Sequence, residues 1–192
     1  MLSYYLLSSF LSSSNNSIGT NTEKLVARAL SVYSKKRELD YITIHDYQFV
    51  SDSTGEINQM DILYLSNKGL FVIEVKCWKG IVLGNQDDMV WTIVKRYGRK
   101  RVTTSSLNPM IQNQNHKEYL LDKIGELNIP IYDVVVFVSN NVDRYKYPNV
   151  IWYKDLFRYL DGKEVNKDIN KDTLSKLFDK LEEKRFINSG NK

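Results

Sequence analysis

Three ionisable residues stand in the most apolar part of the chain, the segment from Asp61 to Lys76. Two runs of aliphatic and aromatic residues flank the turn sequence Ser66-Asn67-Lys68-Gly69, a pattern that predicts a β-hairpin. Strands that are apolar on both faces usually lie in the middle of a sheet. The charges of Asp61, Glu74 and Lys76 therefore need a partner or a function.

The two-residue period of a strand decides whether these three side chains meet. Glu74 and Lys76 are two residues apart, so they project to one face. A hairpin loop of two or four residues puts Asp61 on that same face, opposite Glu74 or Lys76, whereas a three-residue loop turns Asp61 away. We predict the even loop.

Two carboxylates in contact on an apolar sheet favour a divalent cation, because the cation relieves their repulsion and their poor solvation. The ammonium of Lys76 could then orient or deprotonate a water bound to the cation. The alternative is structural. In it, Asp61 and Lys76 form an ordinary cross-strand ion pair, and Glu74 lies at the solvated end of the sheet.

Further motifs surround this segment in a fixed order. They are Gly19-x-x-x-Glu23, Gln59-Met60-Asp61, Gly69-Leu70-Phe71-Val72-Ile73-Glu74-Val75-Lys76, Gly80-x-x-x-Gly84, Trp91 and Asn108-Pro109-x-x-Gln112. The spacing of Asp61 and Glu74-Val75-Lys76 resembles the acidic core of the PD-(D/E)XK nuclease superfamily. The whole series, from about Gly19 to Leu121, resembles the nuclease-related domain called NERD.

The resemblance implies an α/β fold of the restriction-endonuclease-like type, with a mixed central sheet flanked by helices. It implies a metal-dependent nuclease that hydrolyses phosphodiester bonds of DNA, or of RNA. The catalytic residues that it implies are Glu23, Asp61, Glu74, Lys76 and Gln112. The implied metal ligands are Asp61, Glu74, the backbone carbonyl of Val75, and Glu23. The alternative is a catalytically silent module of the same fold that binds nucleic acid or a protein partner.

Composition limits the fold and the cofactor. With 192 residues and 42% hydrophobic content, the chain fits one domain, which we expect over residues 19–188, with a polar tail over 189–192. The one cysteine, Cys77, excludes an internal disulfide and suits a reducing cytoplasm. The only two histidines, His45 and His116, argue against a zinc site and leave oxygen ligands, which favour Mg²⁺ or Mn²⁺.

Residues 1–18 form an N-terminal apolar segment followed by a serine- and asparagine-rich linker. The apolar stretch, Leu2 to Leu11, is shorter than the roughly 20 residues that span a bilayer. We expect a helix or strand that packs on the domain rather than a membrane anchor, so a membrane partner is not expected. A homo-oligomer is compatible with the sequence.

The chain has only a small excess of basic residues, but several of them are close together in the sequence. Lys and Arg number 27 against 23 acidic residues, a net charge of +4, yet the run from Lys95 to Arg101 holds five cations around Gly98. This run predicts the tip of a hairpin that binds nucleic acid, in particular DNA. Its predicted contacts are Lys95, Arg96, Tyr97, Arg99, Lys100 and Arg101, with the tyrosine stacking on a base. A merely solubilising tip is the alternative.

Periodicity predicts the elements that hold these groups. We expect a helix from Gly19 to about Lys36 with Glu23 directed toward the sheet, and a helix from Asn108 to about Glu126. Core positions of the second helix are predicted to be Ile111, Leu120, Leu121, Ile124 and Leu127. Strands are expected over 40–50, 81–83, 89–94, 131–138 and 149–153, and further helices over 154–160 and 172–186. A helix precedes the strand over 131–138, so that strand should be parallel to an earlier one.

Overall fold

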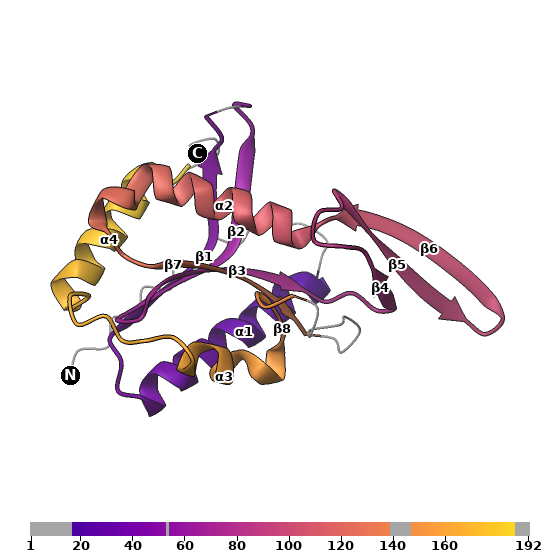
Figure 1. Cartoon of the computed structure of the whole chain (residues 1–192), viewed down its shortest axis with the longest axis horizontal. Helices are drawn as coiled ribbons and strands as arrows, with labels where there is room; N and C mark the ends of the chain where they lie inside the picture. Colours follow the sequence, from indigo (N-terminus) through magenta and orange to yellow (C-terminus); the bar gives the residue numbers. More distant parts are fainter. Residues whose placement is uncertain (1–16, 53, 139–146, 187–192) are drawn as a thin grey trace.

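The structure is a computed structural model that describes residues 17–52, 54–138 and 147–186 (Figure 1). The predicted N-terminal packed segment and the polar tail lie outside the described residues. No helix in the described ranges is both long and apolar enough to cross a bilayer.

The central sheet has five strands in the order β1 (Tyr41–Val50), β2 (Ile57–Ser66), β3 (Gly69–Lys76), β7 (Ile131–Phe137) and β8 (Val150–Trp152). The first three strands are antiparallel, and β3, β7 and β8 are parallel, so the sheet is mixed. Helices cover both faces, which confirms the predicted α/β fold of the restriction-endonuclease-like type (Figure 1). The parallel pairing of β3 with β7 confirms the predicted crossover.

Each face of the sheet carries its own hydrophobic core. Helices α1 (Ser17–Lys36) and α3 (Leu156–Asp161) cover one face, where they bury residues such as Val26, Leu30 and Ile73. Helices α2 (Pro109–Ile124) and α4 (Lys171–Lys184) cover the other, with Leu120, Leu177 and other residues in its core. The short 3₁₀ turns η1 (Gly125–Leu127) and η2 (Tyr153–Asp155) complete the described elements.

The hairpin of β2 and β3 has the predicted even loop. Ser66 pairs with Gly69, so only Asn67 and Lys68 form the loop. Gly69 has a φ of 129°, and a Cβ there would lie 2.5 Å from the Pro130 carbonyl oxygen. Only glycine allows the backbone to come this close to Pro130. The start of β3 therefore packs directly on the segment that precedes β7.

Helix α2 begins as predicted. The side chain of Asn108 accepts a hydrogen bond of 2.9 Å from the Met110 amide, with Pro109 as the first helical residue. The prediction for Leu121 is wrong, because this side chain is 46% exposed. Leu121 follows the inward residue Leu120 and is therefore turned about 100° around the helix axis.

The buried side of α2 contains two polar side chains that the apolar pattern did not assign to it, Asn113 and His116. The amide of Asn113 donates hydrogen bonds of 3.0 and 3.1 Å to the carbonyls of Val72 in β3 and Val134 in β7. Burial of a polar side chain is tolerated where its donors find such partners. Asn113 therefore fixes α2 over the two parallel strands.

A second, three-stranded antiparallel sheet projects from the body as an arm (Figure 1). It consists of β4 (Ile81–Leu83), β5 (Val90–Tyr97) and β6 (Lys100–Leu107). The arm is inserted between β3 and α2, so both of its connections lead directly to elements that carry predicted site residues.

Candidate active site

Strands β2 and β3 separate at the level of the predicted site. Their pairing runs from Ser66 and Gly69 to Ile62 and Ile73. Beyond this point β2 continues only with β1, whereas β3 continues beside β7 to Lys76 (Figure 1). We call this point the fork. Asp61 and Glu74 are the first residues past the last β2–β3 pair, so the register sets them opposite each other at the fork.

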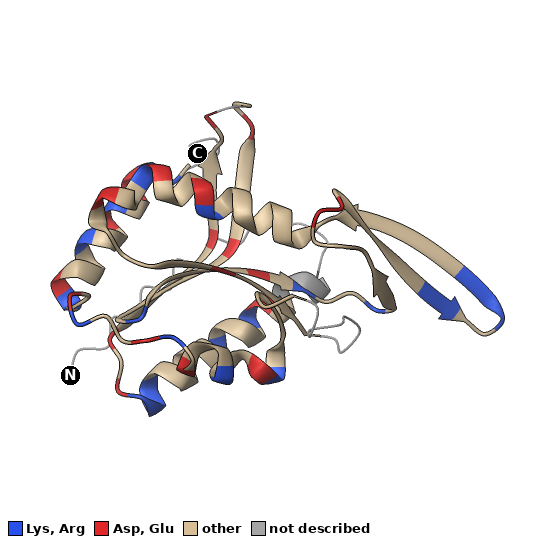
Figure 2. Ribbon diagram, viewed as in Figure 1, with Lys and Arg blue, Asp and Glu red and all other residues tan. Residues whose placement is uncertain are grey.

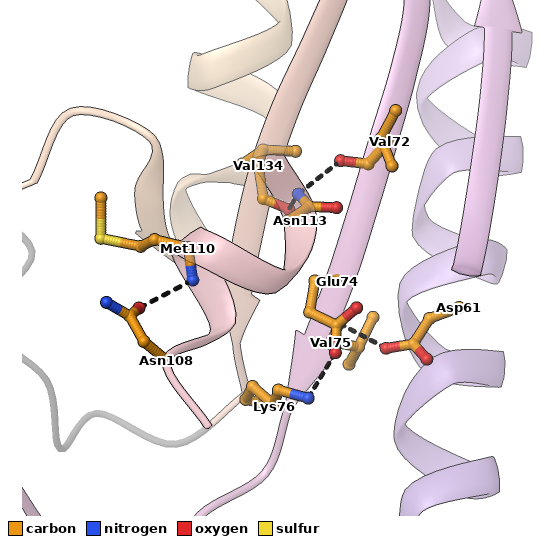
Figure 3. Close-up of polar contacts among 9 residues, drawn as sticks. All are labelled: Asp61, Val72, Glu74, Val75, Lys76, Asn108, Met110, Asn113 and Val134. Carbon is orange, nitrogen blue, oxygen red and sulfur yellow. Dashed lines mark hydrogen bonds and ion pairs between the residues drawn. The ribbon is translucent and has the colours of Figure 1, made fainter. Parts of the chain in front are cut away.

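The fork brings Asp61, Glu74 and Lys76 together (Figure 3). The Asp61 carboxylate accepts a hydrogen bond of 2.8 Å from the Val75 amide. Lys76 Nζ forms an ion pair with Glu74 Oε1. Lys76 thus pairs with Glu74 rather than with Asp61, and Glu74 is only 1% exposed. The structural alternative, an Asp61–Lys76 pair with Glu74 at a solvated sheet end, is wrong.

Glu74 carries an unsatisfied buried atom. Its second carboxylate oxygen, Oε2, is buried and has no hydrogen-bond partner. Burial raises the pKa of the Glu74 carboxyl from 4.5 to about 7, and the charge of Asp61 adds to the rise. Burial also raises the pKa of Asp61, against the opposing effects of the Val75 amide and of Lys76. The two carboxylates therefore lie in surroundings that disfavour their charged forms.

Glu23 lies on α1, which covers the face of the sheet opposite to the one that α2 covers. Its side chain is half-buried, and burial raises its pKa from 4.5 to about 7, with further contributions from Asp61 and Asp46. Within the described part of the chain, no three His, Cys, Asp or Glu side chains form a group that could hold a metal ion. Asp61 and Glu74 are thus a two-carboxylate set with Glu23 nearby.

The donor set at the fork fits a hard divalent cation. It contains the carboxylates of Asp61 and Glu74, and the Oε2 atom of Glu74 has no hydrogen-bond partner among the described residues. The amide and carbonyl of one strand residue point to the same side, so the Val75 carbonyl faces the side on which its amide bonds Asp61. Mg²⁺ is typically held by one or two carboxylates, with water and substrate phosphate completing its shell.

A cavity of about 610 Å³ lies between α2, the β1–β2 turn and the base of the arm, and Asn58, Gln112 and His116 are among the residues that line it. His116 packs edge-on against Phe49, and its Nδ1 is buried without a hydrogen-bond partner. Burial and then the charge of Lys76 lower the pKa of His116 to about 4. The imidazole is therefore neutral at physiological pH, and Gln112 shares the cavity wall with it.

Asp46 lies next to the fork in β1 and is not among the predicted site residues. The pairs on either side of it, His45 with Ile62 and Tyr47 with Met60, set Asp46 across from Asp61. Asp46 has a φ of 48°, and its carboxylate accepts a hydrogen bond of 2.8 Å from Gln59. An aspartate inside an apolar strand was the available signal, since Asp is depleted from strand interiors.

The residues predicted to contact nucleic acid lie away from the fork. Lys95, Arg96, Tyr97, Arg99, Lys100 and Arg101 are at the far end of the arm, at the β5–β6 turn. Figure 2 shows this end as a concentration of basic residues that is separate from the acidic residues at the fork. The predicted hairpin tip is therefore present, and it is not part of the fork itself.

The chain is similar in sequence to known proteins. The sequence profile of the nuclease-related domain matches residues 18–138. An uncharacterised protein of Bacillus anthracis is 28% identical over 150 residues, which cover 75% of this chain and 66% of that protein. No solved structure matches the chain significantly. The matched range contains the fork, the arm and α2, and we conclude that this chain belongs to the nuclease-related domain (NERD) family.

Proposed function

We propose that this chain is a Mg²⁺- or Mn²⁺-dependent nuclease that hydrolyses phosphodiester bonds of DNA. The observation that carries the proposal is Glu74 Oε2, a buried carboxylate oxygen without a partner, beside Asp61 and Lys76. Such an atom is costly in a structural role, because burial of an unsatisfied charged group is unfavourable. A bound cation would offset the cost of burying this oxygen, because the oxygen would then have a ligand.

Asp61 and Glu74, with the Val75 carbonyl, are the residues that would hold the cation, and Glu23 would complete the acidic surroundings. When bound, the cation supplies charge stabilisation at the phosphate and lowers the pKa of a water molecule. The hydrogen bond from the Val75 amide orients the Asp61 carboxylate. Because one carboxylate oxygen is thus fixed by the backbone, the other is left for a ligand.

Lys76 would orient the attacking water through a hydrogen bond from its ammonium. Its ammonium is held by Glu74 Oε1 at the fork and retains partial solvent contact, with 19% of the side chain exposed. Gln112 would contact substrate phosphate or water from the cavity wall, where it lies one helical turn after the start of α2. The cations of the arm would attract the polyanion toward the acidic fork.

The second candidate is a catalytically silent module that binds nucleic acid or a protein partner. The two-carboxylate set favours it to some degree, because no third side-chain ligand of the His, Cys, Asp or Glu type joins the group among the described residues. A silent module that binds nucleic acid would bind DNA as the nuclease does. The two functions differ in cleavage.

We expect the purified chain to nick supercoiled plasmid DNA in Mn²⁺ or Mg²⁺. The reaction should stop when EDTA is added and resume when the metal is restored, because the fork carboxylates need the cation. Gel electrophoresis of the plasmid forms checks this result. Stable DNA binding without nicking in either metal would instead establish the silent module.

A further inference from the structure

The outer part of the arm is a two-stranded ribbon. Strand β4 pairs with β5 only from Thr92 to Val94. Beyond Val94, β5 and β6 continue alone through three residue pairs, Lys95 with Val102, Arg96 with Arg101 and Tyr97 with Lys100. We call residues 95–102 the ribbon. Figure 1 shows it as the most distant part of the arm from the central sheet.

The turn of the ribbon is tight. Gly98 and Arg99 form a two-residue loop, and Gly98 has a φ of 60°. Glycine with positive φ at the first loop position is the signature of a hairpin turn whose twist matches that of its strands. The ribbon therefore ends in a two-residue turn that carries the guanidinium of Arg99.

Cations occupy both faces of the ribbon. Arg96 and Arg101 are directly opposite each other, so they share one face, and Lys95 and Lys100 belong to the other face. Like charges that face each other across a strand pair are destabilising. The sequence contains no acidic residue between Asp88 and Glu118, so the segment from β5 to the first turns of α2 provides no counter-charge.

Charge on both faces indicates the shape of the partner. A flat anionic surface can engage only one face of a ribbon, whereas a groove between two phosphate backbones engages both. Three residues at about 3.4 Å each give the ribbon a reach of roughly 10 Å. The major groove of B-form DNA is about 12 Å wide and about 8.5 Å deep, and it admits a two-stranded ribbon. The narrow major groove of A-form RNA does not admit side chains in this way.

Aromatic packing and hydrogen bonds fix the base of the arm, from which the ribbon extends. Trp91 of β5 stacks on Tyr147 with ring centroids 5.7 Å apart, and the Trp91 indole donates a hydrogen bond of 2.8 Å to the Asn85 carbonyl. The Tyr147 hydroxyl donates a hydrogen bond of 2.7 Å to the Gly84 carbonyl. A Cβ on Gly84 would lie 2.3 Å from the Trp91 ring, so the packing there requires glycine. A preorganised arm binds with little loss of conformational freedom.

We infer that the ribbon inserts into the major groove of a B-form DNA duplex, with Arg96 and Arg101 on one phosphate backbone and Lys95 and Lys100 on the other. This inference rests on the proposed function and names double-stranded DNA as the substrate. It assigns to the arm the role of positioning the duplex, and it leaves the chemistry to the fork.

Fluorescence anisotropy in EDTA tests the inference, since no cleavage takes place there. The ligands are a labelled DNA duplex, its single strand and an RNA duplex of the same sequence. We expect the DNA duplex to bind most tightly. The double variants Arg96→Gln/Arg101→Gln and Lys95→Gln/Lys100→Gln should each weaken duplex binding by roughly tenfold or more at 0.1 M salt. Each should also reduce the slope of log K against log salt by about 2.

The matched control is Lys171→Gln/Lys176→Gln, which removes two charges from exposed positions on α4, at the opposite end of the molecule from the arm (Figure 1). Its affinity should change little. Equal binding of single-stranded DNA or of the RNA duplex, or an effect confined to one face of the ribbon, would overturn the inference. Duplex binding through both faces without any cleavage would refute the nuclease proposal alone. Plasmid cleavage with unchanged binding in both ribbon variants would refute the ribbon inference alone.

Discussion

Replacement of Glu74 by glutamine will reduce the rate of plasmid cleavage by roughly a hundredfold to a thousandfold, a loss of the size seen when one preorganised electrostatic group is removed from an active site. Glutamine keeps the shape of the side chain and an oxygen that can accept from Lys76. It removes the negative charge that the proposed cation requires. The rate of conversion of supercoiled to nicked plasmid in Mn²⁺ measures the effect.

The matched control for this loss is Glu164→Gln. Glu164 is exposed and lies near the β2–β3 turn, where Asn166 donates to the Asn67 carbonyl, at the opposite end of these strands from the fork. This variant should cleave at the wild-type rate. A Glu74→Gln protein that cleaves as fast as wild type would remove the fork from the mechanism.

The same Glu74→Gln replacement will stabilise the metal-free protein at alkaline pH. The folded protein raises the pKa of Glu74 from 4.5 to about 7, so the folded state disfavours the carboxylate. At about 1.4 kcal/mol per pKa unit, this penalty is on the order of 3 kcal/mol once the group is ionised. Glutamine carries no charge and therefore does not incur this penalty. For a chain of this size, the melting temperature at pH 8 in EDTA should rise by roughly 5–10 °C.

The size of this stabilisation depends on pH. Below pH 4.5 the carboxyl is protonated in both the folded and the unfolded chain, so it costs nothing. Between pH 4.5 and about 7 the unfolded chain releases its proton while the folded chain keeps it, and the wild type loses stability relative to the variant. Above about pH 7 the difference is constant.

Thermal unfolding at pH 5 and pH 8 in EDTA, followed by circular dichroism, tests this prediction. The advantage of the glutamine variant should fall to below about 1 kcal/mol at pH 5. Glu164→Gln should match the wild type at both pH values, because Glu164 is exposed. A Glu74→Gln protein that is less stable than wild type at pH 8 would mean that the Glu74–Lys76 ion pair outweighs the cost of burial.

The hairpin at the centre of the molecule could be predicted from the sequence for two reasons. The turn residues located the loop, and once an even loop length was chosen the strand period determined which side chains share a face. A loop of two residues was enough to align Asp61 with Glu74 at the fork. The start of α2 was likewise predictable, because the Asn108 cap and Pro109 act locally.

Other features depend on contacts that no local pattern contains. The buried side of α2 includes Asn113 because two strand carbonyls are available to its amide, and Leu121 lies outside although it is apolar. The position of Asp46 beside Asp61 requires the β1–β2 register. The free length of the ribbon could not be predicted because it depends on where β4 stops pairing, at Val94.

The central claim is that Asp61 and Glu74 form a cation site at the point where β2 and β3 separate. Anomalous diffraction from crystals soaked in Mn²⁺ tests it most directly. We predict a Mn²⁺ ion bound by both carboxylates, with Glu74 Oε2 as one of the ligands. A well-ordered fork with both side chains in place and no ion between them at saturating Mn²⁺ would contradict the account.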